Sequence, residues 1–435
     1  MKRLEEIKEL VNVSILLDEK HICDLIDLID KHCGNDSLCE FLETLNTGNF
    51  SPAEAFVMAN NMAKKGRMLD LSKKIGDCVT RASLGDISDS VSLVVMSVLG
   101  ALDQKVVKVT SPEYGKFSNT FSRLKLIDGF DASISQRKFE KIVAEHNVGF
   151  YENTGELVPV DSKLRKIMSK FPEASIPLLT VSLLAKKIAL GVSTVVYDVK
   201  VGEGGLVKDK QKGYELAKYL VEASKMAGLK VACVVTALNQ PVSASVGSML
   251  ELREVVKTLS SGNAYFDSDL VAVSREICEV ALILMGVADG RIKAGEMFDE
   301  CIMSGNALLK LQEIVKVFGG DFESISTDLN VLSGVASSYI ESEEEGYLAD
   351  VDSMGLYSAC HILNSGIDDS DGDENSGIVM LVREGAKIEI GQKIARLTYS
   401  FDNKNFTRAL KVASDSFLIK SSAVKHDKLL VKVFV

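Results

Sequence analysis

Hydrophobic positions near the N-terminus recur with the spacing of amphipathic helices. This pattern runs from residue 1 to about residue 66. A capping box at Ser51 to Glu54, with Pro52 at the first helical position, marks one helix start, and Gly66 marks its end. The first region is therefore predicted to be all-helical.

The pattern changes to strand-like runs from about residue 74. Residues 74–81 and 105–110 are typical of strands, and residues 92–102 between them are apolar nearly all round, as in a buried helix. This order predicts a βαβ unit, whose crossover should be right-handed.

Residues 174–205 predict a helix, a turn, a buried strand and a glycine-rich bend. Ser175 can cap the helix, and Pro177 falls in its first turn. Ser182 and Lys186 are four residues apart, so they share one helix face. The spacing alone leaves two interpretations open: a hinge helix that presents a lysine and a hydroxyl, or an ordinary αβ unit whose lysine faces water.

The αβ alternation then resumes, with strands at 194–200 and 230–236 and helices at 209–227, 246–259, 268–287, 292–303 and 306–318. A mostly parallel sheet covered by helices is the simplest packing for this order. After an acidic linker at 341–345, strand-like runs at 377–397 and 418–435 predict a small α+β domain.

The composition and net charge of the chain argue against several classes of protein function. The chain has 435 residues and a net charge of −11 without a long basic run, which argues against nucleic-acid binding as its main role. The charged N-terminus is not a signal peptide, and no segment is long enough to span a membrane. The eight cysteines form no CxxC pair, so we expect a reduced cytoplasmic protein without structural zinc.

Polar residues collect where the predicted strands of the βαβ unit end. Backbone N–H groups and the helix dipole favour an anion there, and the ends of parallel strands meet at one edge of the sheet. Five side chains could surround one phosphate: Arg81, Ser83, Ser92, Thr110 and Thr120. Alternatively, Ser83 and Ser88 are helix caps and Arg81 pairs with Asp86 or Asp89. None of the five histidines falls in these loops, so a histidine-based triad or metal site is poorly supported.

Several motifs resemble one known family. Asp198 to Gly205 reads DVKVGEGG, which is similar to the DVKVGSGAF strand and bend of the pyrimidine-nucleoside phosphorylases, the family that includes thymidine phosphorylase. Similar segments are residues 47–72, 239–241 and 246–254. The resemblance covers most of the chain and is weaker after residue 340.

The resemblance implies an α/β fold with a small all-helical lobe, a large α/β lobe with a mostly parallel sheet, and a C-terminal α+β region. The corresponding ranges are 1–66 with 160–190 for the helical lobe, 67–159 with 191–335 for the phosphate-binding lobe, and 336–435 for the C-terminal domain. It also implies a homodimer formed through the helical lobe.

The implied reaction is attack of phosphate on C1′ of a pyrimidine nucleoside, which releases the base and a sugar 1-phosphate. The resemblance places phosphate on Arg81, Ser83, Ser92, Thr110 and Thr120, the base on Ser182, Lys186 and Arg165, and catalysis on Lys186 and Arg81. The family's base-binding arginine aligns with Ile167 without gaps and with Arg165 after a two-residue insertion. No organic cofactor is implied. A monovalent cation such as potassium would bind at Ser88, Ser90, Val242, Ser245 and Glu254.

The sequence departs from the family at the phosphate end. Ala82 stands where the family has a histidine that is thought to protonate the leaving base, and Asp86 replaces a glycine. Residues 110–120 have lost most glycines of the family's second glycine-rich loop. These departures leave three hypotheses: an enzyme of this family with a drifted active site, a non-catalytic homologue that binds a nucleoside, a base or a partner protein, and a different transfer reaction on the same fold.

Overall fold

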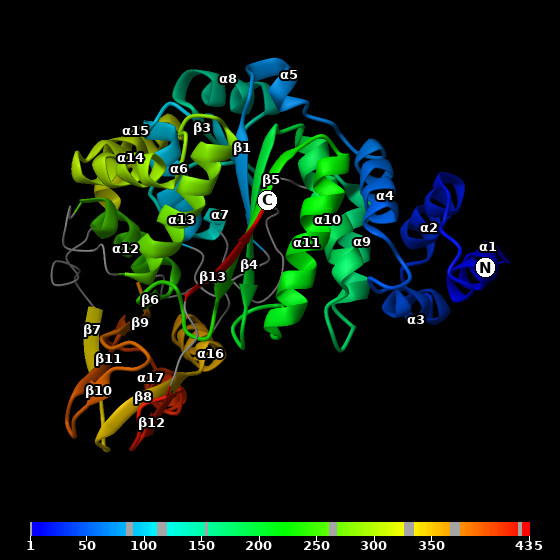
Figure 1. Cartoon of the computed structure of the whole chain (residues 1–435). Helices are drawn as coiled ribbons and strands as arrows, with labels where there is room; N and C mark the ends of the chain where they lie inside the picture. The colour runs from blue at the N-terminus through cyan, green and yellow to red at the C-terminus, as the bar shows by residue number, and fades with distance from the viewer. Residues whose placement is uncertain are drawn as a thin grey trace.

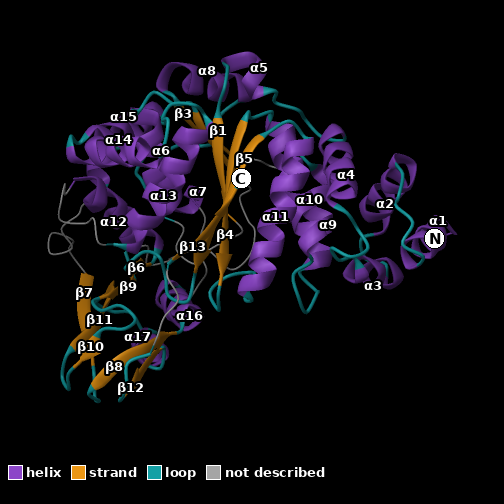
Figure 2. Cartoon of the chain, in the orientation of Figure 1, coloured by secondary structure: helices purple, strands orange, loops and turns teal. Residues whose placement is uncertain are grey.

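A six-stranded sheet forms the centre of the molecule (Figures 1 and 2). The computed structural model describes residues 2–83, 90–110, 120–152, 155–260, 268–325, 335–365, 375–424 and 429–435. The strand order is β13-β5-β4-β1-β2-β3, in which β1 to β5 are parallel to their neighbours and β13 is antiparallel to β5. The strands are β1 (Val79–Ser83), β2 (Val106–Thr110), β3 (Val148–Glu152), β4 (Thr194–Val201), β5 (Lys230–Ala237) and β13 (Leu430–Phe434).

Helices cover both faces of this sheet, because β4 is buried along its whole length and needs apolar partners on each side. Figure 1 shows α6 (Val91–Ala101) and α13 (Asp269–Leu284) on one side and α11 (Lys210–Met226) on the other. The predicted βαβ unit is confirmed as β1-α6-β2, and α6 is buried nearly all round. The strand predicted at 74–81 is wrong in its first half: α5 (Leu71–Ile75) occupies that position and ends at Gly76, whose φ of 85° breaks the helix.

The small lobe consists of helices from two separate parts of the chain. It contains α1 (Lys2–Asn12), α2 (Glu19–His32), α3 (Asp36–Thr44), α4 (Pro52–Lys64), α9 (Pro159–Met168) and α10 (Ile176–Leu190). The predicted capping box is present at the start of α4. Ser175 caps α10 as predicted, and α10 packs against both α4 and α11. This helix therefore joins the small lobe to the sheet.

The C-terminal region has a hydrophobic core of its own. It combines α16 (Ser353–Asn364) and α17 (Phe406–Ser414) with β7 (Val335–Glu341), β8 (Gly346–Val351), β9 (Gly377–Met380), β10 (Lys387–Ile388), β11 (Lys393–Ser400) and β12 (Phe417–Lys420). Short strand β6 (Ser245–Val246), which follows β5 in the chain, pairs with β9 and ties this region to the large lobe. The last strand, β13, leaves the region and pairs with β5. The predicted fold class is thus confirmed.

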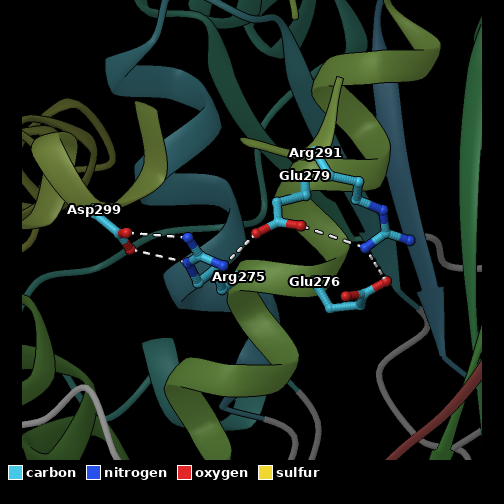
Figure 3. Close-up of polar contacts among 5 residues, drawn as sticks. All are labelled: Arg275, Glu276, Glu279, Arg291 and Asp299. Atoms are coloured by element: carbon cyan, nitrogen blue, oxygen red, sulfur yellow. Dashed lines mark hydrogen bonds and ion pairs between the residues drawn. The ribbon is translucent and has the colours of Figure 1, made fainter. Parts of the chain in front are cut away.

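Ion pairs link α13 to α14 (Arg291–Met303) at the outside of the large lobe. Figure 3 shows Arg275 facing both oxygens of Asp299 and one oxygen of Glu279. Its Nε and Nη2 are each 3.0 Å from an oxygen of Asp299, and its Nη1 is 2.5 Å from Glu279. Arg291 contacts Glu276 and lies 3.3 Å from Glu279, whose side chain is only 6% exposed. Burial raises the pKa of Glu279, and the two arginines oppose this effect. These contacts hold the helices together.

In the described residues, no helix combines the length and the hydropathy needed to cross a membrane.

Candidate functional site

Arg81 lies on β1 close to the edge where the parallel strands end, and its side chain is fully engaged with the protein. Its Nε is 3.2 Å from Oδ2 of Asp198 on β4, its Nη2 pairs with the same oxygen, and its Nη1 donates to Ser92 Oγ at 2.7 Å. The register explains the contact, because Ser83 stands opposite Asp198 and side chains two residues apart share a face. Asp86 and Asp89, the alternative partners, lie outside the described residues.

Two lysines lie on either side of Arg81 and add to its contacts with Asp198 and Ser92. We call this group of polar side chains the cluster. Lys108 on β2 donates from Nζ to Ser92 Oγ at 3.0 Å. Lys200 on β4 lies with its Nζ 2.9 Å from Asp198 Oδ2. The other oxygen of Asp198 accepts a hydrogen bond from Thr236 Oγ1 at 3.0 Å. A continuous chain of polar contacts therefore runs across β2, α6, β1, β4 and β5.

Among the described residues, the cluster contains three cations and one carboxylate. Arg81 and Lys200 contact the carboxylate of Asp198, and Lys108 joins them through Ser92. Burial opposes ionisation of Asp198, but the charges of Lys200 and Arg81 hold its pKa below the usual carboxylate value. The Lys200 side chain is 1% exposed, and within the described chain its Nζ meets no acceptor in hydrogen-bond geometry. The charge balance of the described residues favours an anion at this edge of the sheet.

The predicted hydroxyls occupy different environments around this edge. Ser83 and Thr110 are partly exposed at the ends of β1 and β2. Ser92 belongs to the cluster itself. Thr120 begins α7 (Thr120–Leu124) with a fully buried hydroxyl, which has no hydrogen-bond partner among the described atoms. The structure thus brings Arg81 and Ser92 into direct contact and places Ser83 and Thr110 at neighbouring strand ends.

The residues predicted to hold a base lie on α9 and α10. Lys186 forms an ion pair of 3.0 Å with Asp161 of α9 and keeps 21% of its side chain exposed. Burial and the nearby charge of Arg165 lower the pKa of Lys186, while Asp161 opposes them. Ser182 is buried one turn earlier on α10. Ile167 is buried in the core, so Arg165 is the arginine that lies within electrostatic reach of Lys186.

Lys187 connects the two groups of residues. It lies on α10 beside Lys186, and its side chain is 7% exposed. Burial lowers its pKa to about 7, and the positive charges of Lys108 and Lys186 contribute. Lys187 is therefore within electrostatic reach of Lys186 on the base-side helix and of Lys108 in the cluster.

Ala82, at the position of the family histidine, is part of the core. It lies on β1 opposite Tyr197 and is 5% exposed. Alternation along the strand turns it to the other face from Arg81. In this chain the position carries no proton donor.

The residues predicted to hold a cation are divided among several segments. Ser88 lies outside the described residues. Ser90 is buried directly before α6, and Ser245 begins β6. Glu254 on α12 (Ser248–Ser260) accepts hydrogen bonds from the backbone N–H groups of Ala244 and Ser245, at 2.9 and 2.8 Å. Within the described ranges, no group of three or more histidine, cysteine or acidic side chains forms a metal site.

The sequence prediction missed three charged members of the cluster, Lys108, Asp198 and Lys200, and it also missed Lys187 on α10. A signal was present in β4, where Asp198 and Lys200 interrupt an otherwise apolar buried strand at a spacing of two residues. This spacing puts both on one face, and charged residues in a buried strand need partners. Lys108 and Lys187 gave no such signal, because each is an ordinary lysine in its local pattern.

Comparison with known proteins agrees with the predicted resemblance. No family model matches the chain. Proteins named pyrimidine-nucleoside phosphorylase from Staphylococcus aureus strains USA300 and COL are 29% identical over 366 residues, which cover 83% of this chain and 83% of each relative. The resemblance to this family is confirmed.

Solved structures share the fold at low sequence identity. The anthranilate phosphoribosyltransferase of Thermus thermophilus superposes with a TM-score of 0.57 at 13% identity, covering 72% of this chain and 99% of that protein. The corresponding enzyme of Saccharomyces cerevisiae gives 0.50 at 13% identity, with 72% and 98% covered. Since the identity is low, these structures support the fold alone.

Proposed function

We propose that this chain is a divergent pyrimidine-nucleoside phosphorylase, a pentosyltransferase that uses phosphate to split a pyrimidine nucleoside into base and sugar 1-phosphate. The observation that carries the proposal is the cluster around Asp198, in which, among the described residues, cations outnumber carboxylates at the ends of the parallel strands. An anion is the ligand that such a cluster favours, and Lys187 on α10 lies within electrostatic reach of Lys108.

The residues divide into two roles. Arg81, Lys108 and Lys200 hold the phosphate with the hydroxyls of Ser83, Ser92, Thr110 and Thr120. Ser182, Lys186 and Arg165 hold the base, on which negative charge grows as the glycosidic bond breaks. Preorganised positive groups at both ends lower the barrier to such a reaction.

Ala82 favours a second candidate function, a homologue that binds a nucleoside or base without turning it over. General acid catalysis typically contributes about 10²–10⁴-fold to a rate, and Ala82 cannot supply a proton. This alternative predicts ligand binding through Ser182, Lys186 and Arg165 without release of free base.

The test is to incubate the protein with phosphate and thymidine, uridine, deoxyuridine or cytidine and to measure free base. We expect slow phosphate-dependent release from at least one nucleoside, and a loss of about 10-fold or more in Lys186→Met, because that lysine would contact the base. Lys170→Met, at an exposed lysine between α9 and α10, is the matched control and should keep its rate.

Turnover with none of the four nucleosides would contradict the enzymatic proposal. A thermal-shift measurement with phosphate, uracil and the nucleosides then tests the second candidate. Stabilisation by a nucleoside or base, lost in Lys186→Met, would support a binding protein, whereas the absence of any shift would contradict it.

A further inference from the structure

The segment that follows β5 lies at the edge of the proposed site and against the glycine-rich bend after β4. The Leu238 carbonyl accepts a hydrogen bond from Gly204 N at 3.0 Å. A side chain at Gly202 would approach Asn239 Oδ1 to 2.4 Å, so the two segments are in close contact. The start of the segment after β5 therefore packs directly against the bend.

One guanidinium from the C-terminal region holds this segment. Arg383, in the turn between β9 and β10, donates from Nη1 to the Pro241 carbonyl at 2.7 Å and from Nη2 to the Val242 carbonyl at 2.8 Å. Its Nη2 also lies 3.2 Å from Asp269 Oδ2 at the start of α13. Arg383 thus binds two consecutive carbonyl oxygens and a carboxylate, a set of ligands that a small cation would also prefer.

Two of the groups expected to bind a monovalent cation, the Val242 carbonyl and the Glu254 carboxylate, already have hydrogen-bond donors within the protein. The Val242 carbonyl is bonded to Arg383, and both carboxylate oxygens of Glu254 accept backbone N–H groups. A cation placed there would meet a positive charge already in position.

We propose that Arg383 takes the place of a bound monovalent cation, so that the segment after β5 is ordered by the protein's own charge. Arg383 is a positioning residue: it acts through the backbone of residues 241–242. This inference goes beyond the proposed function, because it concerns ion dependence and holds whether or not the protein turns over a nucleoside.

The experiment measures the melting temperature of the full chain in potassium chloride and in choline chloride at equal ionic strength. The wild type is expected to melt at the same temperature in both salts. Arg383→Met should melt on the order of 3 °C lower in choline chloride, because two carbonyls and Asp269 lose a charged donor, and should regain part of the loss in potassium. Arg408→Met, at an exposed arginine on α17, is the matched control and should match the wild type.

Two results would overturn the proposal. One is a potassium-specific stabilisation of the wild type, and the other is an Arg383→Met variant that is lowered equally in both salts. Where Arg383→Met fails to fold, Arg383→Lys keeps the charge and decides the question: indifference to potassium supports the proposal, and stabilisation by potassium contradicts it. Melting requires no catalysis, so failure here is distinguishable from failure of the proposed function.

Discussion

At the scale of single residues, the strongest feature is the concentration of cations around the carboxylate of Asp198. Arg81 reaches Asp198 and Ser92 at once, and Lys108 reaches the same hydroxyl. A buried charge is tolerated only when it is paired, so these residues depend on each other. Lys187 is the exception, because the charged groups that shift its pKa, Lys108 and Lys186, are cations as well.

Lys187 should therefore make stability depend on pH in a particular direction. Its pKa is about 7 in the folded protein and about 10.4 in an unfolded chain, so between these values the folded state binds fewer protons and stability rises with pH. Lys187→Met should increase the free energy of unfolding by on the order of 3 kcal/mol at about pH 6, and the gain should shrink toward pH 10.

Denaturant unfolding of both proteins at several pH values measures this effect. Lys170→Met provides an exposed lysine for comparison and should show no such trend. A gain for Lys187→Met that is the same at every pH would mean that packing, and not the charge, is responsible.

At the scale of elements, local sequence patterns predicted those helices and strands whose formation depends on residues close together in the chain. The βαβ unit, the capped helix α10 and strand β4 follow from periodicity and capping residues close in the chain. The partner of Arg81 could not be predicted in this way, because Asp198 is 117 positions away and the two meet only once β1 and β4 pair. For the same reason, the sequence predicted some of the residues of the candidate site, but it did not predict the contacts between their side chains.

The ion pairs that link α13 to α14 give a prediction at this scale. Arg275→Met removes three charged hydrogen bonds and leaves Glu279, which is nearly buried, with fewer partners. We expect a loss of about 1–3 kcal/mol in the free energy of unfolding, measured by denaturant unfolding. Lys293→Met on α14 removes an exposed ion pair of 3.9 Å and should change stability by less than about 0.5 kcal/mol. If both substitutions change the free energy of unfolding equally, a structural role for these ion pairs is contradicted.

At the scale of the whole molecule, the helical lobe exposes an apolar surface. Val13, Ile15 and Leu16, between α1 and α2, are 65%, 53% and 70% exposed. We propose that this surface belongs to a homodimer interface formed by the helical lobe. We further propose that the protein acts in the cytoplasm, where its eight free cysteines would stay reduced.

The dimer can be tested by light scattering coupled to size-exclusion chromatography. The wild type should have the mass of two chains, and Leu16→Asp should shift the population toward one chain, because it places a charge in an apolar contact. Met303→Asp, at an exposed methionine on α14, should leave the mass unchanged. A monomeric wild type, or a Leu16→Asp variant that remains fully dimeric, would contradict this interface.

The position of β13 has a consequence for the synthesis of the protein. The strand covers the outer edge of β5 and follows the whole of the C-terminal region in the chain. Until β13 leaves the ribosome, β5 presents an unpaired edge, the kind of surface on which strands of other chains can pair. The central sheet is therefore completed only after the C-terminal region has been synthesised, and a nascent chain stalled before residue 430 carries an open edge along its central sheet.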